Sequence, residues 1–544
     1  MERMNTAQAI VAMLEKNGID TIFCLPGVQN DVFFDALYDR TNKIRPVHAR
    51  HEQACAYMAL GAALATDKPQ AYVVVPGPGF LNTTAALSTA YSANAKVLAL
   101  IGQISQSLIG RNIGLLHELP DQLAIMRGLT KWSARIRGAS EAPSLVNDAF
   151  RNMQSGRPRP VGLECAMDVW GRSAVVDLPA GGAVVEKIPV DEEALEQAAK
   201  LLGNAERPLI AVGGGAQAAS AEVKALAEAL QAPVLSIRMG HGVLDGRHAL
   251  HVTGPAGYRL WGEADVVLAV GTRLQQQQQN WGVDEDLKII RIDADPEELD
   301  RQNRPALGIV GEAAPCLRVL VDRLARHNKK RNGRAEAIRE VKAQTAQRLA
   351  VLKPQLEYLE AIRAALPEDG IFVDELTQIG YAARLALPVY KPRTFLSTGY
   401  QGTLGWGYAT SLGVKVAKPD TPVLSVNGDG GFLFTAMEMA TAAQNGIGVV
   451  AVVFNDGAYG NVKRIQQQSY KGRTIASDLR NPDFVKMAES FGVEGMRAET
   501  PDALRKCIER GFARGGPVLI DAPVGPMPDP WQFVQVPKNR PHKA

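Results

Sequence analysis

The stretch Val423–Phe432, which reads VLSVNGDGGF, decides the fold more than any other part of the chain. A β-branched apolar run ends there in a glycine-rich turn, and helical spacing follows over Ala436–Gln444. A second apolar run, Val449–Phe454, then ends in NDGAY. Short apolar strands that alternate with helices are typical of a parallel sheet covered on both faces. We therefore predict a strand–helix–strand unit whose two turns meet at one edge of a sheet.

The same alternation of strands and helices extends over the whole chain of 544 residues. At roughly 150 residues per domain, this length predicts three or four domains. The other expected strands share a short β-branched apolar composition: Ala71–Val75, Val97–Ile101, Val161–Glu164, Leu209–Val212, Val266–Val270, Ile289–Ile292 and Val518–Ile520. The pattern predicts an α/β protein made of doubly wound parallel sheets.

Two segments are typical of linkers. Residues 171–189 are rich in glycine, proline and valine, and residues 327–334 form the basic run HNKKRNGR. We interpret the basic run as the solvated face of a connecting helix rather than a nucleic-acid site. These breaks predict three blocks, 1–172, 188–325 and 345–544.

The overall charge and the cysteines narrow the functional classes. The formal net charge is +3, which is too small to argue for nucleic acid or an anionic membrane surface as a partner. Five scattered cysteines without a C-x-x-C pair favour a reducing compartment over a disulfide framework. No apolar run reaches the ~18 residues that a membrane helix needs, so we expect a cytoplasmic protein.

Two polar residues stand at the ends of the two strands in the deciding stretch. Asp429 supplies a carboxylate and Asn455 an amide oxygen, a donor set that suits a hard divalent cation such as Mg²⁺. The neighbouring glycines let backbone N–H groups approach phosphate oxygens, and a carbonyl near Gly457 could complete the metal site. Taken alone, either motif is more often a simple turn. The strand–helix–strand context favours the metal site.

This combination of G-D-G, helix, strand and N-x-G resembles the thiamine-diphosphate fingerprint of the acetolactate synthase-like family, which includes benzaldehyde lyase and benzoylformate decarboxylase. The resemblance implies that Asp429, Asn455 and the Gly457 carbonyl bind Mg²⁺. It also implies a set of residues that contact the cofactor from the third block: Thr377, Gln378, Gly428, Gly430, Gly431, Ala458 and Tyr459.

The other half of the fingerprint lies upstream, where Arg50-His51-Glu52 opens a helix of small residues. Alone, Glu52 is a common acid for the first turn of a helix. In the family, a glutamate in this context reaches into the partner subunit and exchanges a proton with the aminopyrimidine ring. The resemblance therefore implies that Glu52 is catalytic, that a homodimer is the minimum unit and that a homotetramer is usual.

Further matches cover all three blocks. Pro26 and Gly27 stand in the turn after the first strand, and Asn82 ends the segment GPGFLN. In the segment GYQGTLG, the resemblance implies that the Gly402 carbonyl accepts from the cofactor's amino group and that Leu404 wedges between its rings. The alternative for Leu404 is core packing. The implied fold is a pyrimidine-binding, a central and a diphosphate-binding domain.

The substrate is less well defined by the sequence. Gln29 stands where related lyases place serine or histidine, and His117 stands where the family places a polar residue over the thiazolium ring. His117 could protonate or orient a carbonyl oxygen, or it could be an ordinary loop histidine. We expect a lyase or carboligase that acts on a 2-oxo acid or a 2-hydroxy ketone.

Two other functions stay open. One is a flavin-linked 2-oxo-acid oxidase of the same fold, and the other is a non-catalytic homologue that only binds the cofactor. The strand and glycine turn of Val212–Ala216 could take FAD or ADP, or could be a vestigial loop. The arginine- and aspartate-rich stretch of anabolic acetolactate synthases is absent over Gly271–Trp281. Met527–Phe533 could be a lid or could pack on a neighbouring element.

Overall fold

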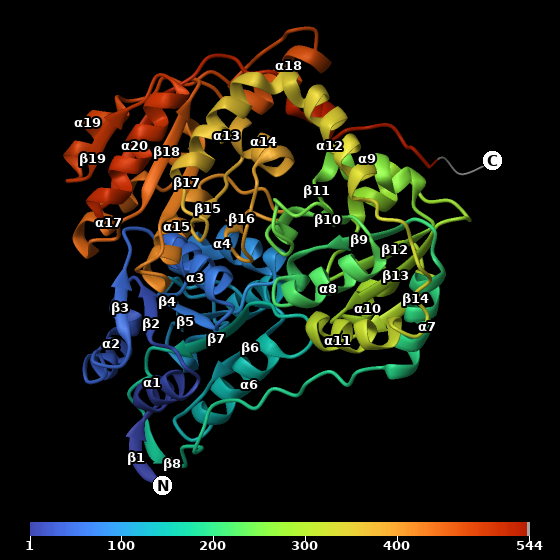
Figure 1. Cartoon of the computed structure of the whole chain (residues 1–544). Coiled ribbons are helices and arrows are strands. Elements are labelled where there is room, and N and C mark those ends of the chain that lie inside the picture. Colours follow the sequence, from blue (N-terminus) through green and yellow to red (C-terminus); the bar gives the residue numbers. More distant parts are fainter. Residues whose placement is uncertain (541–544) are drawn as a thin grey trace.

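The computed structural model describes residues 1–540 and contains three six-stranded sheets, in each of which every pair of neighbouring strands is parallel (Figure 1). Helices cover both faces of each sheet, so the predicted α/β class with three doubly wound domains is confirmed. The last four residues of the predicted third block lie outside the described residues.

The N-terminal sheet has the strand order β3-β2-β4-β5-β7-β6. Its strands are β2 (Thr21–Cys24), β3 (Arg45–His48), β4 (Gln70–Val74), β5 (Val97–Gln103), β6 (Trp132–Ile136) and β7 (Val161–Ala166). Its helices are α1 (Thr6–Lys16), α2 (Asp31–Tyr38), α3 (Glu52–Thr66), α4 (Pro78–Ala93), α5 (Gln122–Leu129) and α6 (Ala142–Gln154). A short antiparallel pair, β1 (Glu2–Asn5) with β8 (Ser173–Val176), joins the start of the chain to the segment that leaves this domain.

The C-terminal sheet has the strand order β16-β15-β17-β18-β20-β19, the same order as the N-terminal sheet when each is numbered along its own chain segment. Its strands are β15 (Ile371–Val373), β16 (Phe395–Leu396), β17 (Val423–Gly428), β18 (Val450–Asn455), β19 (Glu494–Arg497) and β20 (Val518–Pro523). In both sheets the order reverses between the first and third strands, which is where open α/β sheets bind ligands.

The helices of the C-terminal domain are numerous and partly short. They are α12 (Ala335–Leu349), α13 (Lys353–Ala365), α14 (Gln378–Ala386), α15 (Trp406–Ala417), α16 (Asp429–Phe432), α17 (Met439–Asn445), α18 (Gly460–Ser469), α19 (Phe484–Ser490) and α20 (Pro501–Arg514). The helix predicted over Ala436–Gln444 is split into a 3₁₀ turn, η7 (Ala436–Glu438), and α17.

The central sheet has the order β11-β10-β9-β12-β13-β14, which is the arrangement of dinucleotide-binding folds. Its strands are β9 (Pro208–Val212), β10 (Val234–Ser236), β11 (His251–Val252), β12 (Val266–Val270), β13 (Lys288–Asp293) and β14 (Leu307–Val310). Its helices are α7 (Glu192–Asn204), α8 (Ser220–Leu230), α9 (Gly254–Glu263), α10 (Pro296–Asp300) and α11 (Ala313–Leu324). All nine strands predicted from the sequence are present.

The N- and C-terminal domains pack through α3 and α15, which lie side by side in Figure 1. A Cβ atom on Gly61 would lie 2.1 Å from the Thr410 carbonyl oxygen, and one on Gly413 would lie 1.9 Å from the Met58 carbonyl oxygen. Only glycine permits such close contact between two helix backbones. Both helices are largely buried on all sides, which explains their small residues.

A second contact ties the Arg50-His51-Glu52 motif to the C-terminal domain. The backbone N–H groups of Arg50 and His51 donate to the buried carboxylate of Glu438 at 3.1 and 3.0 Å. Burial raises the pKa of Glu438, although these N–H groups and Thr441 oppose the shift. The start of α3 is therefore fixed before any partner binds.

The predicted role of the basic run was wrong. Residues 327–334 form no helix and instead connect α11 to α12. The Arg331 guanidinium donates to the carbonyl oxygens of Leu202, Gly203 and Ala205, the last turn of α7 and the residue after it. A cation at a helix C-terminus satisfies unpaired carbonyls and the helix dipole, so this arginine is structural.

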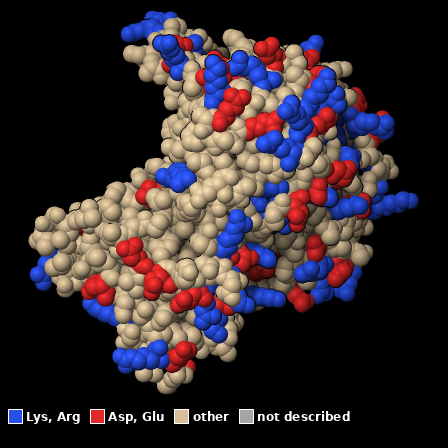
Figure 2. Space-filling model, turned by 90° about the vertical axis from the view of Figure 1, so that its left-hand side faces the viewer, with Lys and Arg blue, Asp and Glu red and all other residues tan. Residues whose placement is uncertain are grey.

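The surface carries charges of both signs. Figure 2 shows Lys, Arg, Asp and Glu side chains interspersed on one part of the visible face, beside a broad area with few charges. No single-sign patch of the kind that binds nucleic acid stands out on this face. Within residues 1–540, no helix is long and apolar enough to span a membrane.

Candidate active site

The carboxyl ends of β17 and β18 carry the two residues predicted to bind a metal. Asp429 directly follows β17 and is only 2% exposed. Its carboxylate accepts hydrogen bonds from the N–H groups of Gly430 at 2.8 Å and Gly457 at 2.9 Å. Asn455 ends the neighbouring strand, and its amide donates to Asp521 at 3.3 Å. Both side chains are thus oriented by their surroundings.

Asn481 shows that the two oxygens converge on one point. Its Nδ2 atom donates to Oδ2 of Asp429 at 2.6 Å and to Oδ1 of Asn455 at 2.9 Å. A hard cation at such a point would have one carboxylate and one amide oxygen as ligands. Within residues 1–540 there is no cluster of three or more His, Cys, Asp or Glu side chains that could bind a metal.

Neighbouring side chains leave no room for a Cβ atom at the last two glycines of the G-D-G-G turn. A Cβ atom on Gly430 would lie 2.5 Å from the Tyr459 ring, and one on Gly431 would lie 2.6 Å from Oε1 of Glu375. Glu375 is 1% exposed and accepts the N–H of Gly405 at 2.5 Å. Burial raises its pKa to about 8. Glu375 therefore links the G-D-G-G turn to the 399–405 loop.

A cavity of about 50 Å³ lies beside these residues. Thr377 caps the N-terminus of α14 through its hydroxyl, which accepts the Gly380 N–H at 2.8 Å, and the Gln378 Oε1 atom has no hydrogen-bond partner among residues 1–540. The positive end of this helix suits a diphosphate. The predicted residues that line the cavity are Thr377, Gln378, Gly428, Asp429 and Ala458.

The turn after β18 is braced by a later loop. The Gly457 carbonyl accepts the Leu479 N–H at 2.7 Å, which leaves its second lone pair, and the Tyr459 N–H donates to Ser477 at 2.8 Å. Burial and then the charge of Asp429 raise the pKa of Asp456 to about 6. The later loop therefore holds the turn in place.

Glu52 lies at the equivalent edge of the N-terminal sheet. It is the first residue of α3, and its Oε2 atom accepts from the Asn82 amide at 2.9 Å. A Cβ on Gly79 would lie 3.7 Å from Oε1, so the first turn of α4 passes close to this carboxylate. Gly27 packs on Val75, where a Cβ would lie 2.6 Å from Cγ1. The predicted Pro26-Gly27 turn therefore adjoins the same loop.

His117 contacts the loop that precedes Asn82. It has a positive φ of 69°, an unusual backbone for a histidine, and Gly77 faces it with a φ of 59°. A Cβ on Gly77 would lie 2.6 Å from the His117 carbonyl oxygen. The Gln29 amide lies 3.5 Å from the Leu116 carbonyl oxygen, and Nδ1 of His117 is buried with no hydrogen-bond partner in the described part of the chain. The structure thus brings Gln29 and His117 to one side of the loop that contains Gly77 and precedes Asn82.

A buried polar chain that the sequence analysis missed supports this loop. Gln122 accepts the Gly77 N–H at 3.1 Å and donates to Glu164 at 3.0 Å. Arg135 donates to the same carboxylate at 2.5 Å, and Glu164 is fully buried. Gln122 is the N1 residue of α5, and sequence spacing gives no sign that it contacts a turn 45 residues earlier.

The 399–405 loop has the geometry of a glycine turn. Gly402 has a φ of 61°, and the hydroxyls of Thr403 and Thr89 lie 2.7 Å apart. Leu404 is half-buried and belongs to none of the core clusters formed by residues 1–540.

In one chain the two sets of residues stay apart. Within residues 1–540, no hydrogen bond or ion pair joins Glu52 or Asn82 to Asp429 or Asn455. Each set lies at the carboxyl edge of its own sheet.

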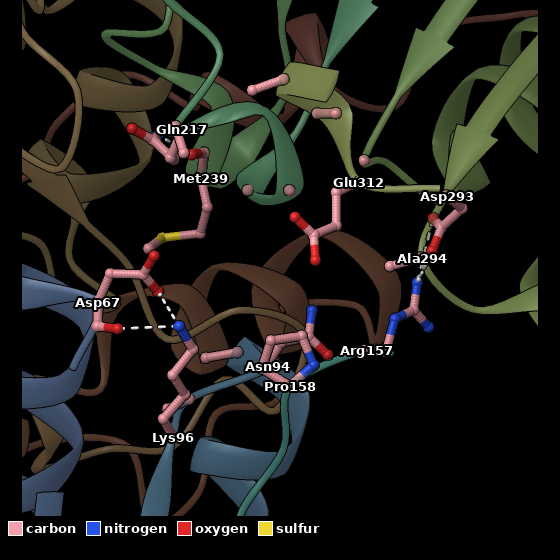
Figure 3. A pocket seen from close by; sticks show the side chains of 18 of the residues that line it. Asp67, Asn94, Lys96, Arg157, Pro158, Gln217, Met239, Asp293, Ala294 and Glu312 are labelled. Atoms are coloured by element: carbon pink, nitrogen blue, oxygen red, sulfur yellow. Dashed lines mark hydrogen bonds and ion pairs between the residues drawn. The ribbon is translucent and has the colours of Figure 1, made fainter. Parts of the chain in front are cut away.

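The central domain has a larger pocket of about 310 Å³ at its own switch point (Figure 3). Arg157 is already paired there with Asp293, at 3.2 Å, and with Glu298, at 2.6 Å. A Cβ on Gly213 would lie 2.4 Å from the Gly271 carbonyl oxygen, so packing alone requires a glycine at this position of the turn. FAD or ADP in this pocket stays a prediction.

Comparisons with known proteins identify the family. Three models match: the thiamine pyrophosphate enzyme N-terminal TPP binding domain over residues 4–125, its central domain over 195–320 and its C-terminal TPP binding domain over 377–522. Thiamine pyrophosphate is another name for thiamine diphosphate.

The chain belongs to the thiamine pyrophosphate enzymes.

Relatives place it near the acetolactate synthases. It is 34% identical to a probable acetolactate synthase large subunit of Methanocaldococcus jannaschii, over 96% of this chain and 92% of the relative. It is 32% identical to a probable 2-ketoarginine decarboxylase of Pseudomonas aeruginosa, over 95% of this chain and 94% of the relative. It is 30% identical to an acetolactate synthase of Bacillus subtilis, over 95% of this chain and 93% of the relative. The protein is therefore a thiamine-diphosphate-dependent enzyme of the acetolactate synthase-like family.

Proposed function

We propose that this enzyme breaks or forms a carbon–carbon bond beside the carbonyl group of a 2-oxo acid or a 2-hydroxy ketone. The convergence of Asp429 and Asn455 on one point, at the sheet edge equivalent to the one that carries Glu52, is the observation that carries the proposal. When bound, thiamine diphosphate supplies a carbon nucleophile that also takes up the electron pair of the broken bond.

Mg²⁺ would be held by the Asp429 carboxylate, the Asn455 amide oxygen and the Gly457 carbonyl. The donor set fits a hard cation, and the buried Gln378 Oε1 and the glycine turn fit a polar ligand beside it. The Asn481 side chain would have to move before the metal binds, because its amide donates to the Asp429 and Asn455 oxygens. Thr377, Gly428, Gly430 and Gly431 would surround the diphosphate.

Glu52 would hold and transfer a proton through its Oε1 atom, because Asn82 already engages Oε2. Leu404 and the Gly402 carbonyl would fix the bent shape of the cofactor. His117 and Gln29 would face the substrate, His117 as a proton donor or a hydrogen-bond donor to its carbonyl oxygen. Ala458 and Tyr459 would line the edge of the site.

The site would form between two subunits, with Glu52 from one and Asp429 from the other. Exposed apolar side chains flank both sets, which supports a second copy as the partner: Val28, Leu81, Leu116, Leu433, Phe434 and Met437. We propose a homodimer as the minimum unit and a homotetramer as the assembly. Sedimentation velocity measures both.

The substrate class is tested by incubation with thiamine diphosphate, Mg²⁺ and pyruvate, with and without an aldehyde, while CO₂ and products are followed by mass spectrometry. CO₂ together with acetolactate or a mixed hydroxy ketone supports a pyruvate-using synthase. If pyruvate is inert, the same assay is repeated with larger 2-oxo acids, among them 2-ketoarginine. Inertness towards every 2-oxo acid and hydroxy ketone contradicts the proposal.

A flavin-linked oxidase is the second candidate, favoured by the strand order of the central sheet. The visible absorption spectrum of the purified protein decides this, since bound flavin makes the protein yellow.

A further inference from the structure

The C-terminal domain contains a buried carboxyl group that the proposed function does not use. Glu375 comes shortly after β15 and is only 1% exposed. Its Oε1 atom accepts the N–H of Gly405, the residue before α15, and Oε2 has no hydrogen-bond partner among residues 1–540. The next residue, Leu376, lines the predicted cofactor cavity, so this carboxyl group lies close to that site.

The other buried acids of residues 1–540 are better compensated than Glu375. Five of them pair with an arginine, and two accept hydrogen bonds from three donors each. The five are Glu164, Asp293, Glu298, Asp374 and Asp521, and the two are Asp429 and Glu438. Within the described chain, Glu375 has one donor and no cation. Its surroundings therefore do not suit a negative charge.

The adjacent residue gives a matched comparison. Asp374 is also fully buried, but the Arg384 guanidinium donates to its two oxygens at 2.7 and 3.1 Å. An uncompensated buried carboxyl group keeps its proton, because burial disfavours the charged form. Burial raises the pKa of Glu375 to about 8, while the Gly405 N–H opposes the shift and the charge of Asp374 adds to it. Of two neighbouring acids, one is thus compensated as an ion and the other is not.

The elements packed around Glu375 bring no further cation to it. Their titratable groups are Asp374 beside it, Tyr57 of α3, Tyr381 and Arg384 of α14, Tyr408 of α15 and Asp429 of the G-D-G-G turn. Arg384 is already paired with Asp374. Burial raises the pKa of all three tyrosines, which are therefore neutral near pH 7. The carboxylate of Asp429 has the same sign as an ionised Glu375 and disfavours it.

Glycines from two segments surround this carboxyl group. A Cβ atom on Gly431 would lie 2.6 Å from Oε1, and one on Gly407 would lie 3.0 Å from Oε2. Gly405 has a φ of 79° and directs its N–H to the same group. Gly431 belongs to the G-D-G-G turn, whereas Gly405 and Gly407 belong to the end of the 399–405 loop and the start of α15. One carboxyl group therefore sets the spacing between the turn and the loop.

We propose that Glu375 is a positioning residue that acts as an uncharged carboxylic acid and fixes the G-D-G-G turn against the loop that bends the cofactor. The neutral acid accepts the Gly405 N–H without adding negative charge beside the place of a diphosphate. The positioning role rests on the proposed function. The absence of charge on Glu375 does not.

The charge is tested on the enzyme without cofactor or metal, through the apparent melting temperatures of the wild type and Glu375→Gln from pH 5 to pH 8. Glutamine keeps an oxygen for the Gly405 N–H and has no charge. The unfolded chain releases the Glu375 proton near its ordinary pKa of 4.5, whereas the folded chain keeps it up to about pH 8. Stability provided by this group therefore falls as the pH rises between these values.

The melting temperature of Glu375→Gln, relative to the wild type, should accordingly rise by at least about 3 °C from pH 5 to pH 8. All other titrating groups are common to both proteins, so the difference isolates Glu375. Glu360→Gln, an exposed glutamate of α13 in the same domain, is the control, and its difference from the wild type should not change with pH. A pH-independent difference for Glu375→Gln, or one that falls with pH, would overturn the uncharged acid.

The positioning role is tested by the Kd of thiamine diphosphate at saturating Mg²⁺ and pH 7. Glu375→Gln should bind within about threefold of the wild type, and Glu375→Ala at least about tenfold more weakly. Wild-type affinity for Glu375→Ala, or a loss in Glu375→Gln as large as in Glu375→Ala, would overturn this role. If even the wild type does not bind thiamine diphosphate, the proposed function and the positioning role fail together, whereas the melting temperatures still decide the charge.

Discussion

Replacement of Gly431 by alanine should distort the G-D-G-G turn through a single neighbour, Glu375. The added Cβ would lie 2.6 Å from Oε1 and 2.9 Å from Cδ of that carboxyl. The carboxyl is held in place, because Glu375 is only 1% exposed and its Oε1 atom accepts the Gly405 N–H. Overpacking of this kind costs about 1–3 kcal/mol.

A double-mutant cycle isolates the contact. Glu375→Ala alone leaves the Gly405 N–H unpaired, at a cost of about 1–3 kcal/mol. In that background the methyl group that Gly431→Ala adds enters vacated space, so this second substitution should cost less than about 0.5 kcal/mol. The expected coupling free energy between the two positions is therefore about 1–3 kcal/mol.

The assay is the apparent melting temperature of the four proteins at one scan rate, together with the Kd of thiamine diphosphate. For a domain of this size, each kcal/mol shifts the melting temperature by roughly 2–4 °C. Gly516→Ala is the control. Gly516 lies in the C-terminal domain with only Arg514 near its Cβ position, so this substitution should change neither the melting temperature nor the Kd measurably. Additive effects of Gly431→Ala and Glu375→Ala would refute the reasoning.

The proton-transfer group, the metal ligands and the buried histidines give three further predictions. Glu52→Gln should keep cofactor affinity but lower kcat by at least about 100-fold, and an unchanged kcat would exclude Glu52 as the proton-transfer group. Asp429→Ala should abolish Mg²⁺-dependent retention of the cofactor on dialysis; tight retention would disprove the ligand set. Burial lowers the pKa of His241 to about 4 and of His251 to about 3. Because the unfolded chain binds these protons near pH 6.5 and the folded chain does not, stability should fall as the pH drops from about 6.5 towards 3. A melting temperature that stays constant over that range would contradict this.

The strands and the C-terminal half of the site were predictable because they depend on local sequence. Val423–Gly428 and Val450–Asn455 are buried on both faces, so their apolar runs are visible without any knowledge of the partners. Asp429 and Asn455 follow directly from the ends of these strands, and parallel strands bring their carboxyl ends to one edge.

Residues that act through distant contacts were not predictable. Asn481 bonds Asp429 across 52 positions, and Gln122 reaches Gly77 from another element. In the sequence, Glu375 is an ordinary acidic residue after a strand. Only the structure shows its contacts with Gly405 and Gly431. The error over the basic run has the same cause, since Arg331 is fixed by carbonyls of α7 more than 120 positions earlier.

The shared topology of the N- and C-terminal sheets was also invisible in the sequence. Topology depends on which strands pair, and many sequences satisfy one strand order. In the proposed function both sheets contribute, because the carboxyl edge of one carries Glu52 and the carboxyl edge of the other carries Asp429. This pairing of two half-sites is the central claim of the account.

Subunit complementation tests that claim most directly. Glu52→Gln and Asp429→Ala chains, each inactive alone, are co-expressed in equal amounts, and the activity per site is measured. If each site combines Glu52 of one subunit with Asp429 of another, random pairing restores about a quarter of the wild-type sites. If both residues serve a site within one chain, the mixture stays as inactive as either variant, and the proposed two-subunit site is wrong.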